Sequence, residues 1–215
     1  MTGTLVAVMV AMWIALEQHG GSTNLQVLLR AGAQENILIW SGQWWRLVTP
    51  IFLHYGVLHL ALNTLALWFA GSIVESTFGH LRLLLIFFLA GVGGSLAELL
   101  FDPRSHLITV GASGAIFGLF GALLYLGTLV HQRQNWGGFL RSVLLTVVLA
   151  FAYGFLPGSD INNYVHAGGF LTGLAVGATL GVPGYPGQTW QRFFGFLLLL
   201  SLGYLVLVSW PVPLF

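Results

Sequence analysis

The sequence has few charged residues and lacks cysteine and lysine altogether. Only 6% of its 215 residues are charged, and all seven basic residues are arginine. A soluble domain carries about 25% charged residues, so seven basic and six acidic side chains could not cover its surface. The absence of cysteine excludes disulfides, thiol nucleophiles and thiolate metal sites. A net charge of +1 without a basic cluster gives no indication of nucleic-acid binding.

Hydrophobic residues make up 57% of the chain and form long continuous stretches. Such stretches predict transmembrane helices, because the strands of a membrane barrel would alternate apolar and polar residues. We therefore expect an all-α polytopic membrane protein with a single transmembrane domain over residues 1–215. The first apolar run has no basic residue before it and no clear cleavage site after it. We interpret this run as a retained helix and not as a signal peptide.

Seven segments are candidate spans, for which about 20 mostly apolar residues are needed. They lie at about residues 5–16, 57–73, 83–100, 112–130, 139–156, 164–180 and 193–210. The first is short for a span. We expect a core at about 5–181 and an additional C-terminal helix at about 193–210. The polar segment 22–50 carries several tryptophans, which are typical of the headgroup level, and predicts an interfacial substructure.

The arginines indicate an orientation by a narrow margin. If the N-terminus is cytoplasmic, four arginines lie on the cytoplasmic side, namely Arg82, Arg133, Arg141 and Arg192. Three lie on the outer side, namely Arg30, Arg46 and Arg104. Because arginine is enriched on the cytoplasmic side, this favours a cytoplasmic N-terminus. Ser113 and His166 begin spans that are two crossings apart, so both lie near one face whichever orientation holds. That face would be extracytoplasmic.

Two glycine-rich helix faces would bring this serine and histidine together. Glycine follows His166 at Gly169, Gly173, Gly177 and Gly181, and it follows Ser113 at Gly114, Gly118 and Gly121. Such faces allow close helix packing, which would place Ser113 beside a base that can take its proton. The alternative is that both polar side chains are interfacial and that the glycines reflect membrane-helix composition. The cost of burying a histidine at this depth favours a function.

Other polar side chains could complete such a site. His59 and Asn63 share one helix face and could bind an oxyanion together with the Ser113 N–H, although they could equally be a polar pair between helices. Asp160 could extend the pair to a triad, but its loop position favours a solvated acid, so we expect a Ser–His dyad. The sequence contains no His-Glu-x-x-His motif and places no carboxylate beside these histidines. We therefore expect no metal and no other cofactor.

The sequence resembles the rhomboid family of intramembrane serine proteases from about residue 42 to 181. The matching pieces, in chain order, are Trp45-Arg46, His54, His59-x-x-x-Asn63, Glu75, Gly111-Ala-Ser113-Gly114 and His166-x-x-Gly169-x-x-x-Gly173. One departure is Val165, where the family usually has alanine or glycine, so the approach of this helix would be slightly tighter.

The resemblance implies a bundle of six transmembrane helices plus a seventh, C-terminal one. It implies that Ser113 is the nucleophile, His166 the general base, and His59 and Asn63 part of the oxyanion hole. Supporting residues would be Gly111, Gly114, Phe117 on the imidazole, His54, and Arg46 in a membrane-embedded loop. The fifth span, with Phe151, Tyr153 and Phe155, would gate substrate entry.

The activity implied is that of a serine endopeptidase, which cleaves transmembrane segments of membrane proteins through an acyl-enzyme. Its partners would be those substrates and the lipid bilayer, in a bacterial inner membrane. Two other functions stay open. A non-catalytic relative that binds membrane clients typically lacks the serine or histidine, and this chain has both. A small transporter would distribute polar residues through the bilayer depth, whereas here they cluster near one face. The sequence predicts no particular oligomeric state.

Overall fold

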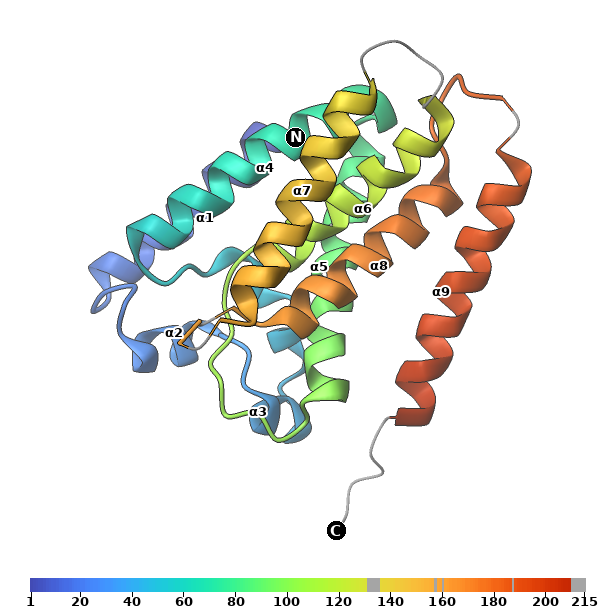
Figure 1. The fold of residues 1–215 in the computed structure, drawn as a ribbon. Helices are drawn as coiled ribbons and strands as arrows, with labels where there is room; N and C mark the ends of the chain where they lie inside the picture. The colour runs from blue at the N-terminus through green and yellow to red at the C-terminus, as the bar shows by residue number, and fades with distance from the viewer. Residues whose placement is uncertain (131–135, 157, 160, 187, 210–215) are drawn as a thin grey trace.

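The computed structural model describes residues 1–130, 136–156, 158–159, 161–186 and 188–209. Long helices dominate this part of the chain (Figure 1). They are α1 (Thr2–Gln18), α4 (Gly56–Phe78), α5 (His80–Phe101), α6 (Ser113–Val130), α7 (Trp136–Gly154), α8 (Asn163–Leu180) and α9 (Thr189–Ser209). Each coincides with one predicted apolar segment, so the all-α fold is confirmed.

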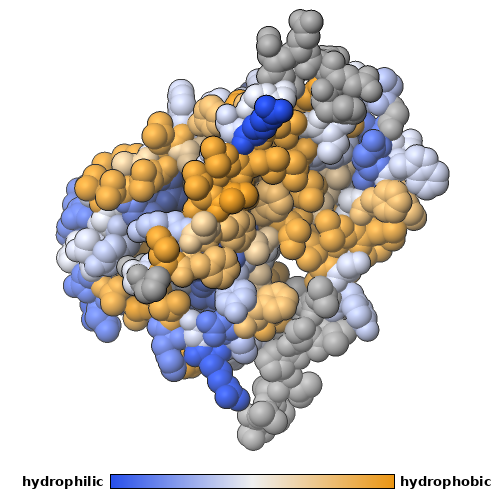
Figure 2. Space-filling view, in the orientation of Figure 1, coloured by the Kyte–Doolittle hydropathy of each residue, from blue (hydrophilic) through white to orange (hydrophobic). Residues whose placement is uncertain are grey.

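Four of these helices, α4, α5, α6 and α7, are each long and apolar enough to cross a membrane by themselves. Helix α1 is apolar but shorter, at 17 residues. Apolar side chains cover the middle of the face shown in Figure 2, and hydrophilic ones gather at its margins. Leu58 and Leu65 of α4 are 71% and 68% exposed, as expected for side chains that face lipid.

The segment between α1 and α4 folds into short helices of its own. These are α2 (Leu25–Ala31), α3 (Asn36–Trp40), η1 (Trp44–Leu47) and η2 (Thr49–Phe52), the last two being 3-10 helices. The Arg46 side chain is buried and donates hydrogen bonds to the carbonyls of Leu29 at 2.9 Å and Ala33 at 2.6 Å. Arg46 therefore fastens η1 to the end of α2.

Helix α8 packs directly against α5 on one side and α6 on another (Figure 1). The faces in contact are made of small residues. A Cβ atom at Gly118 would lie 3.0 Å from the Gly169 carbonyl oxygen, and one at Gly173 would overlap the backbone of Gly118. Glycine is therefore required at these positions, because only the absence of a side chain lets the two backbones approach this closely.

Replacing Gly173 by alanine tests this packing. The added methyl group meets backbone atoms, which cannot move aside, so we expect a loss of about 1–3 kcal/mol of stability. For a chain of this size that lowers the Tm by at least about 2–4 °C. Thermal denaturation in detergent micelles measures the change.

Gly203→Ala in α9 is the matched control, because nothing lies within 4 Å of a Cβ at Gly203. This variant should keep its Tm or gain slightly, since alanine is about 0.5–1 kcal/mol better than glycine within a helix. Equal Tm changes in the two variants would contradict the packing argument.

Candidate active site

Ser113 is the first residue of α6, and the loop before it is fixed by hydrogen bonds to the segment that precedes α4. Gly111 has a φ of +121°, a left-handed conformation that side chains rarely adopt, and its N–H donates to the Pro50 carbonyl at 2.9 Å. The Ala112 N–H donates to Nε2 of His54 at 3.5 Å. The loop therefore enters α6 with Ser113 half-buried at the helix start, where backbone N–H groups have no acceptor within the helix.

His166 lies in the first turn of α8, with Nε2 2.9 Å from Ser113 Oγ. The helix begins at a side-chain cap, since Asn162 Oδ1 accepts the N–H groups of Tyr164 at 3.1 Å and Val165 at 3.4 Å. Val165, the departure noted in the sequence, fits into space left by glycines. A Cβ atom at Gly114 would lie only 2.7 Å from Val165 Cγ1.

Two aromatic rings fix the imidazole of His166. The Phe117 ring stacks on it with centroids 4.1 Å apart and planes inclined by 8°. The Phe151 ring meets its edge, at 6.2 Å and 89°. Within the described part of the chain, no group hydrogen-bonds Nδ1 of His166. Asp160, the candidate third member of a triad, lies outside the described residues.

His59 is oriented toward the loop that carries the serine. Its Nδ1 accepts the Tyr55 N–H at 3.4 Å, so the proton of the neutral imidazole resides on Nε2. A Cβ atom at Gly111 would lie 2.8 Å from that Nε2. The edge of the His59 ring that carries Nε2 therefore lies beside Gly111, two residues before Ser113, in space that the missing side chain leaves free.

Asn63 and His54 are both buried. Asn63 Nδ2 donates to the His59 carbonyl at 2.9 Å, which uses one of the two N–H bonds of its amide. The rings of His54 and His59 meet at 5.3 Å and 65°. Burial, followed by the neighbouring His59, lowers the pKa of His54 to about 3, so His54 is neutral near neutral pH.

A buried polar cluster that the sequence did not reveal supports the loop between α5 and Ser113, called the serine loop below. Gln34 and Thr109 exchange two backbone hydrogen bonds of 3.0 Å, which join the interfacial segment to this loop. The Thr109 hydroxyl donates to Glu98 at 2.9 Å, and Glu98 is completely buried. In the sequence, Glu98 lies near the end of the candidate span at 83–100. The Thr109 hydroxyl, which is close to Glu98 only in three dimensions, provides a hydrogen bond to one oxygen of this buried carboxyl.

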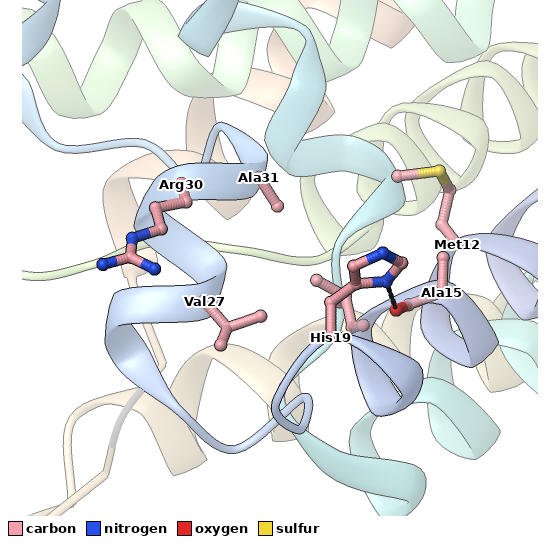
Figure 3. A pocket seen from close by; sticks show the side chains of 7 residues that line it. Met12, Ala15, His19, Val27, Arg30 and Ala31 are labelled. Atoms are coloured by element: carbon pink, nitrogen blue, oxygen red, sulfur yellow. Dashed lines mark hydrogen bonds between the residues drawn. The ribbon is translucent and has the colours of Figure 1, made fainter.

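The cavity in Figure 3 belongs to a different part of the molecule. It has a volume of about 370 Å³ and lies between α1 and α2, where His19 Nδ1 is 2.7 Å from the Ala15 carbonyl. Its lining residues are Met12, Ala15, Leu16, His19, Val27, Arg30 and Ala31. None of them is a candidate site residue, so the cavity is not part of the Ser113–His166 site.

Residues 41–183 match the Rhomboid domain family, which covers more than half of the chain. The chain belongs to the rhomboid family. It is therefore an integral membrane protein with several spans, in agreement with its apolar helices.

Several rhomboid relatives are similar over much of the chain. Rhomboid protease GluP of Bacillus subtilis is 42% identical over 201 residues, which are 94% of this chain and 38% of that protein. RHOMBOID-like protein 5 of Arabidopsis thaliana is 40% identical over 73% of this chain and 50% of its own length. Putative rhomboid protease YdcA of Bacillus subtilis is 37% identical over 63% of this chain and 69% of its own length. The chain thus spans half or less of the length of the first two relatives.

Removing the Thr109 hydroxyl tests the support of the serine loop. Thr109→Val keeps the side-chain shape but leaves the Glu98 carboxyl without its hydrogen bond, at a cost of about 1–3 kcal/mol. We expect a clear decrease in Tm in detergent micelles.

Thr64→Val is the matched control, because the Thr64 hydroxyl donates only to a carbonyl of its own helix, Ala61, at 3.0 Å. Its free energy of unfolding should change by no more than about 0.5 kcal/mol. A Thr109→Val protein as stable as this control would show that the buried cluster does not support the loop.

Proposed function

We propose that this rhomboid is a serine endopeptidase that cleaves transmembrane segments of membrane proteins. The observation that carries the proposal is the 2.9 Å contact between Ser113 Oγ and His166 Nε2. Both residues lie in the first turns of helices in the interior of an apolar bundle, at the same end. A serine hydroxyl becomes an effective nucleophile when a neighbouring base removes its proton. A second support is the 42% identity to a protein named rhomboid protease.

The proposed reaction has two stages. His166 Nε2 takes the Ser113 proton while Oγ attacks the carbonyl carbon of the substrate peptide bond. The resulting tetrahedral intermediate collapses as His166 returns the proton to the leaving amine, and the acyl group remains as an ester on Ser113. Water then attacks this ester with His166 again as the base, which releases the second product and regenerates the hydroxyl.

The oxyanion of the tetrahedral intermediate would be bound by three donors. These are Nε2–H of His59, the second N–H of the Asn63 amide, and the backbone N–H of Ser113 at the start of α6. Donors fixed before the reaction stabilise developing charge at little cost of reorganisation. The His59 orientation and the space at Gly111 support this assignment.

His54 has a supporting role in the proposal. Its burial keeps the imidazole neutral, with a pKa of about 3, and its contact with the Ala112 N–H holds the backbone next to Ser113. Hydrolysis of the acyl-enzyme also needs water at the serine, and a neutral imidazole in contact with the polar loop offers hydrogen-bonding groups for it.

We place the site at the extracytoplasmic end of the bundle, with a cytoplasmic N-terminus, in a bacterial inner membrane. The support is the four-to-three division of arginines between the two sides. In this arrangement the Ser113–His166 pair would cleave substrates close to the outer surface of the membrane.

The decisive experiment uses a labelled single-span substrate in proteoliposomes. Wild type should cleave it, and Ser113→Ala and His166→Ala should each reduce the rate at least about 10³-fold, because the two residues act as a unit. His59→Ala should cost about 10²–10³-fold, as expected for the loss of one oxyanion donor. Equal cleavage by wild type and Ser113→Ala would refute the proposal. If wild type binds membrane clients but cleaves none of a panel, the client-binding function is correct.

Gly111→Ala tests the geometry beside the serine. The added Cβ meets the His59 ring at 2.8 Å, so it should displace the oxyanion donor and lower the cleavage rate at least about 10-fold. The left-handed φ adds a strain of about 1–3 kcal/mol.

Gly79→Ala separates the strain from the contact, since Gly79 has a similar φ of +93° but no atom within 4 Å of a Cβ. Both variants should lose stability, and only Gly111→Ala should lose activity. Full activity of Gly111→Ala would show that His59 is not a donor in this position.

A further inference from the structure

Helix α7 is attached to the bundle far less firmly than its neighbours. Only 11% of its apolar stretch is buried, against 78% for α6. Its buried side chains include Val143 and Val147, whereas Leu145, Leu149 and Tyr153 are each 57–58% exposed. A helix with so little buried surface can move at a small cost in free energy. The few contacts that it makes therefore decide its position.

The N-terminal half of α7 (Figure 1) is held by apolar contacts. Leu140 fills the space next to Gly127 of α6, where a Cβ atom would lie 2.8 Å from Leu140 Cγ. The ring of Phe139 is 6.3 Å from that of Phe69 in α4. These contacts form a base about which the rest of the helix can swing.

The C-terminal half is held at Phe151. The ring of Phe151 contacts Phe117 at 5.3 Å and His166 at 6.2 Å, so it closes one side of the site. Its carbonyl is among the last four of α7, which lack hydrogen-bond partners within the helix. Asn163 of α8 supplies that partner, because its Nδ2 donates to the Phe151 carbonyl at 3.3 Å.

The chain is built to admit this hydrogen bond. Gly154 faces the Asn163 amide, and a Cβ atom at Gly154 would lie 2.8 Å from Asn163 Cγ and 2.9 Å from Nδ2. Beside the contact is an open groove of about 430 Å³. Its walls include Phe151, Gly154, Phe155, Asn163, Tyr164 and Ala167. Because the groove leaves this junction partly unpacked, the amide contact contributes much of the attachment.

We propose that Asn163 is a latch that holds the C-terminal end of α7, and with it the Phe151 ring, closed against His166. Release of the Asn163–Phe151 hydrogen bond would let this end of α7 move outward about the base at Leu140, and a transmembrane substrate would then enter. The family resemblance implies that this helix gates the site, and the structure assigns the residue that keeps the gate closed. The substrate part of the inference rests on the proposed protease function.

Two variants break the latch from opposite sides. Asn163→Ala removes the donor, and Gly154→Ala expels the amide with an added methyl group. Loss of one hydrogen bond of this kind should raise the ratio of open to closed α7 about 2- to 10-fold. Gly154→Ala is informative because alanine favours the helix more than glycine does. Opening in that variant cannot result from a weaker helix.

Asn162→Ala is the matched control. It removes the neighbouring amide, which caps α8 through Tyr164 and Val165, while the donor to α7 stays in place. This variant should lose stability without a change in the ratio of open to closed α7.

Because the chain has no cysteine, spin labels can be introduced without background. One label replaces exposed Tyr153 near the end of α7, and the other replaces exposed Leu171 on α8. Distances are measured by pulsed electron paramagnetic resonance in nanodiscs, in a Ser113→Ala background. In Asn163→Ala and Gly154→Ala, a larger share of the molecules should show a long distance between the two labels. Moving the first label to Leu145, near the base, should give the same distances in all variants.

Unchanged distances in both latch variants, or equal lengthening in Asn162→Ala, would overturn the proposal. With Ser113 intact, substrate cleavage should rise about 2- to 10-fold in Asn163→Ala and Gly154→Ala. Unchanged or slower cleavage, despite longer distances, would refute the role in substrate entry. If the latch variants open while no protein cleaves any substrate, the latch stands and the protease function fails, so the two failures can be told apart.

Discussion

The backbone contact between α6 and α8 is the constraint on which the site depends. Where Gly118 meets Gly169 and Gly173, the two helices approach without side chains between them. This contact brings the first turns of both helices together and leaves 2.9 Å between the Ser113 hydroxyl and the His166 imidazole. A single methyl group between these backbones would separate the pair, so the distance between Oγ and Nε2 is set by packing about one to two turns away.

The bundle combines a rigid interior with a loosely attached outer helix. Helices α5, α6 and α8 are fixed by small-residue contacts, and the serine loop is tied down through Pro50, Gln34 and Glu98. Helix α7 has little buried surface, and its C-terminal half depends on Phe151 and one amide contact. The proposed protease activity would need both properties, because its catalytic groups must be preorganised while membrane-embedded substrates are admitted.

The fold was largely predictable because a membrane helix requires a long stretch of apolar residues, which can be recognised in the sequence. All seven long helices lie on the predicted segments, and the glycine period predicted which faces meet. The burial of Glu98 was not predictable, since its partner Thr109 becomes adjacent only when the serine loop folds back. The Asn163 contact was missed for a similar reason: a polar residue three positions before His166 resembles a helix cap in sequence, a part that Asn162 plays. In both cases the decisive partner belongs to a different element.

We propose that packing makes Ser113 a nucleophile activated by His166. Intact-mass spectrometry after reaction with a fluorophosphonate measures this directly and without a substrate. Wild type should carry one covalent adduct per chain, located at Ser113 by peptide mapping. Ser113→Ala should carry none, and labelling of His166→Ala should be strongly slowed. Labelling of His166→Ala at the wild-type rate, or an adduct at another serine, would contradict the proposal.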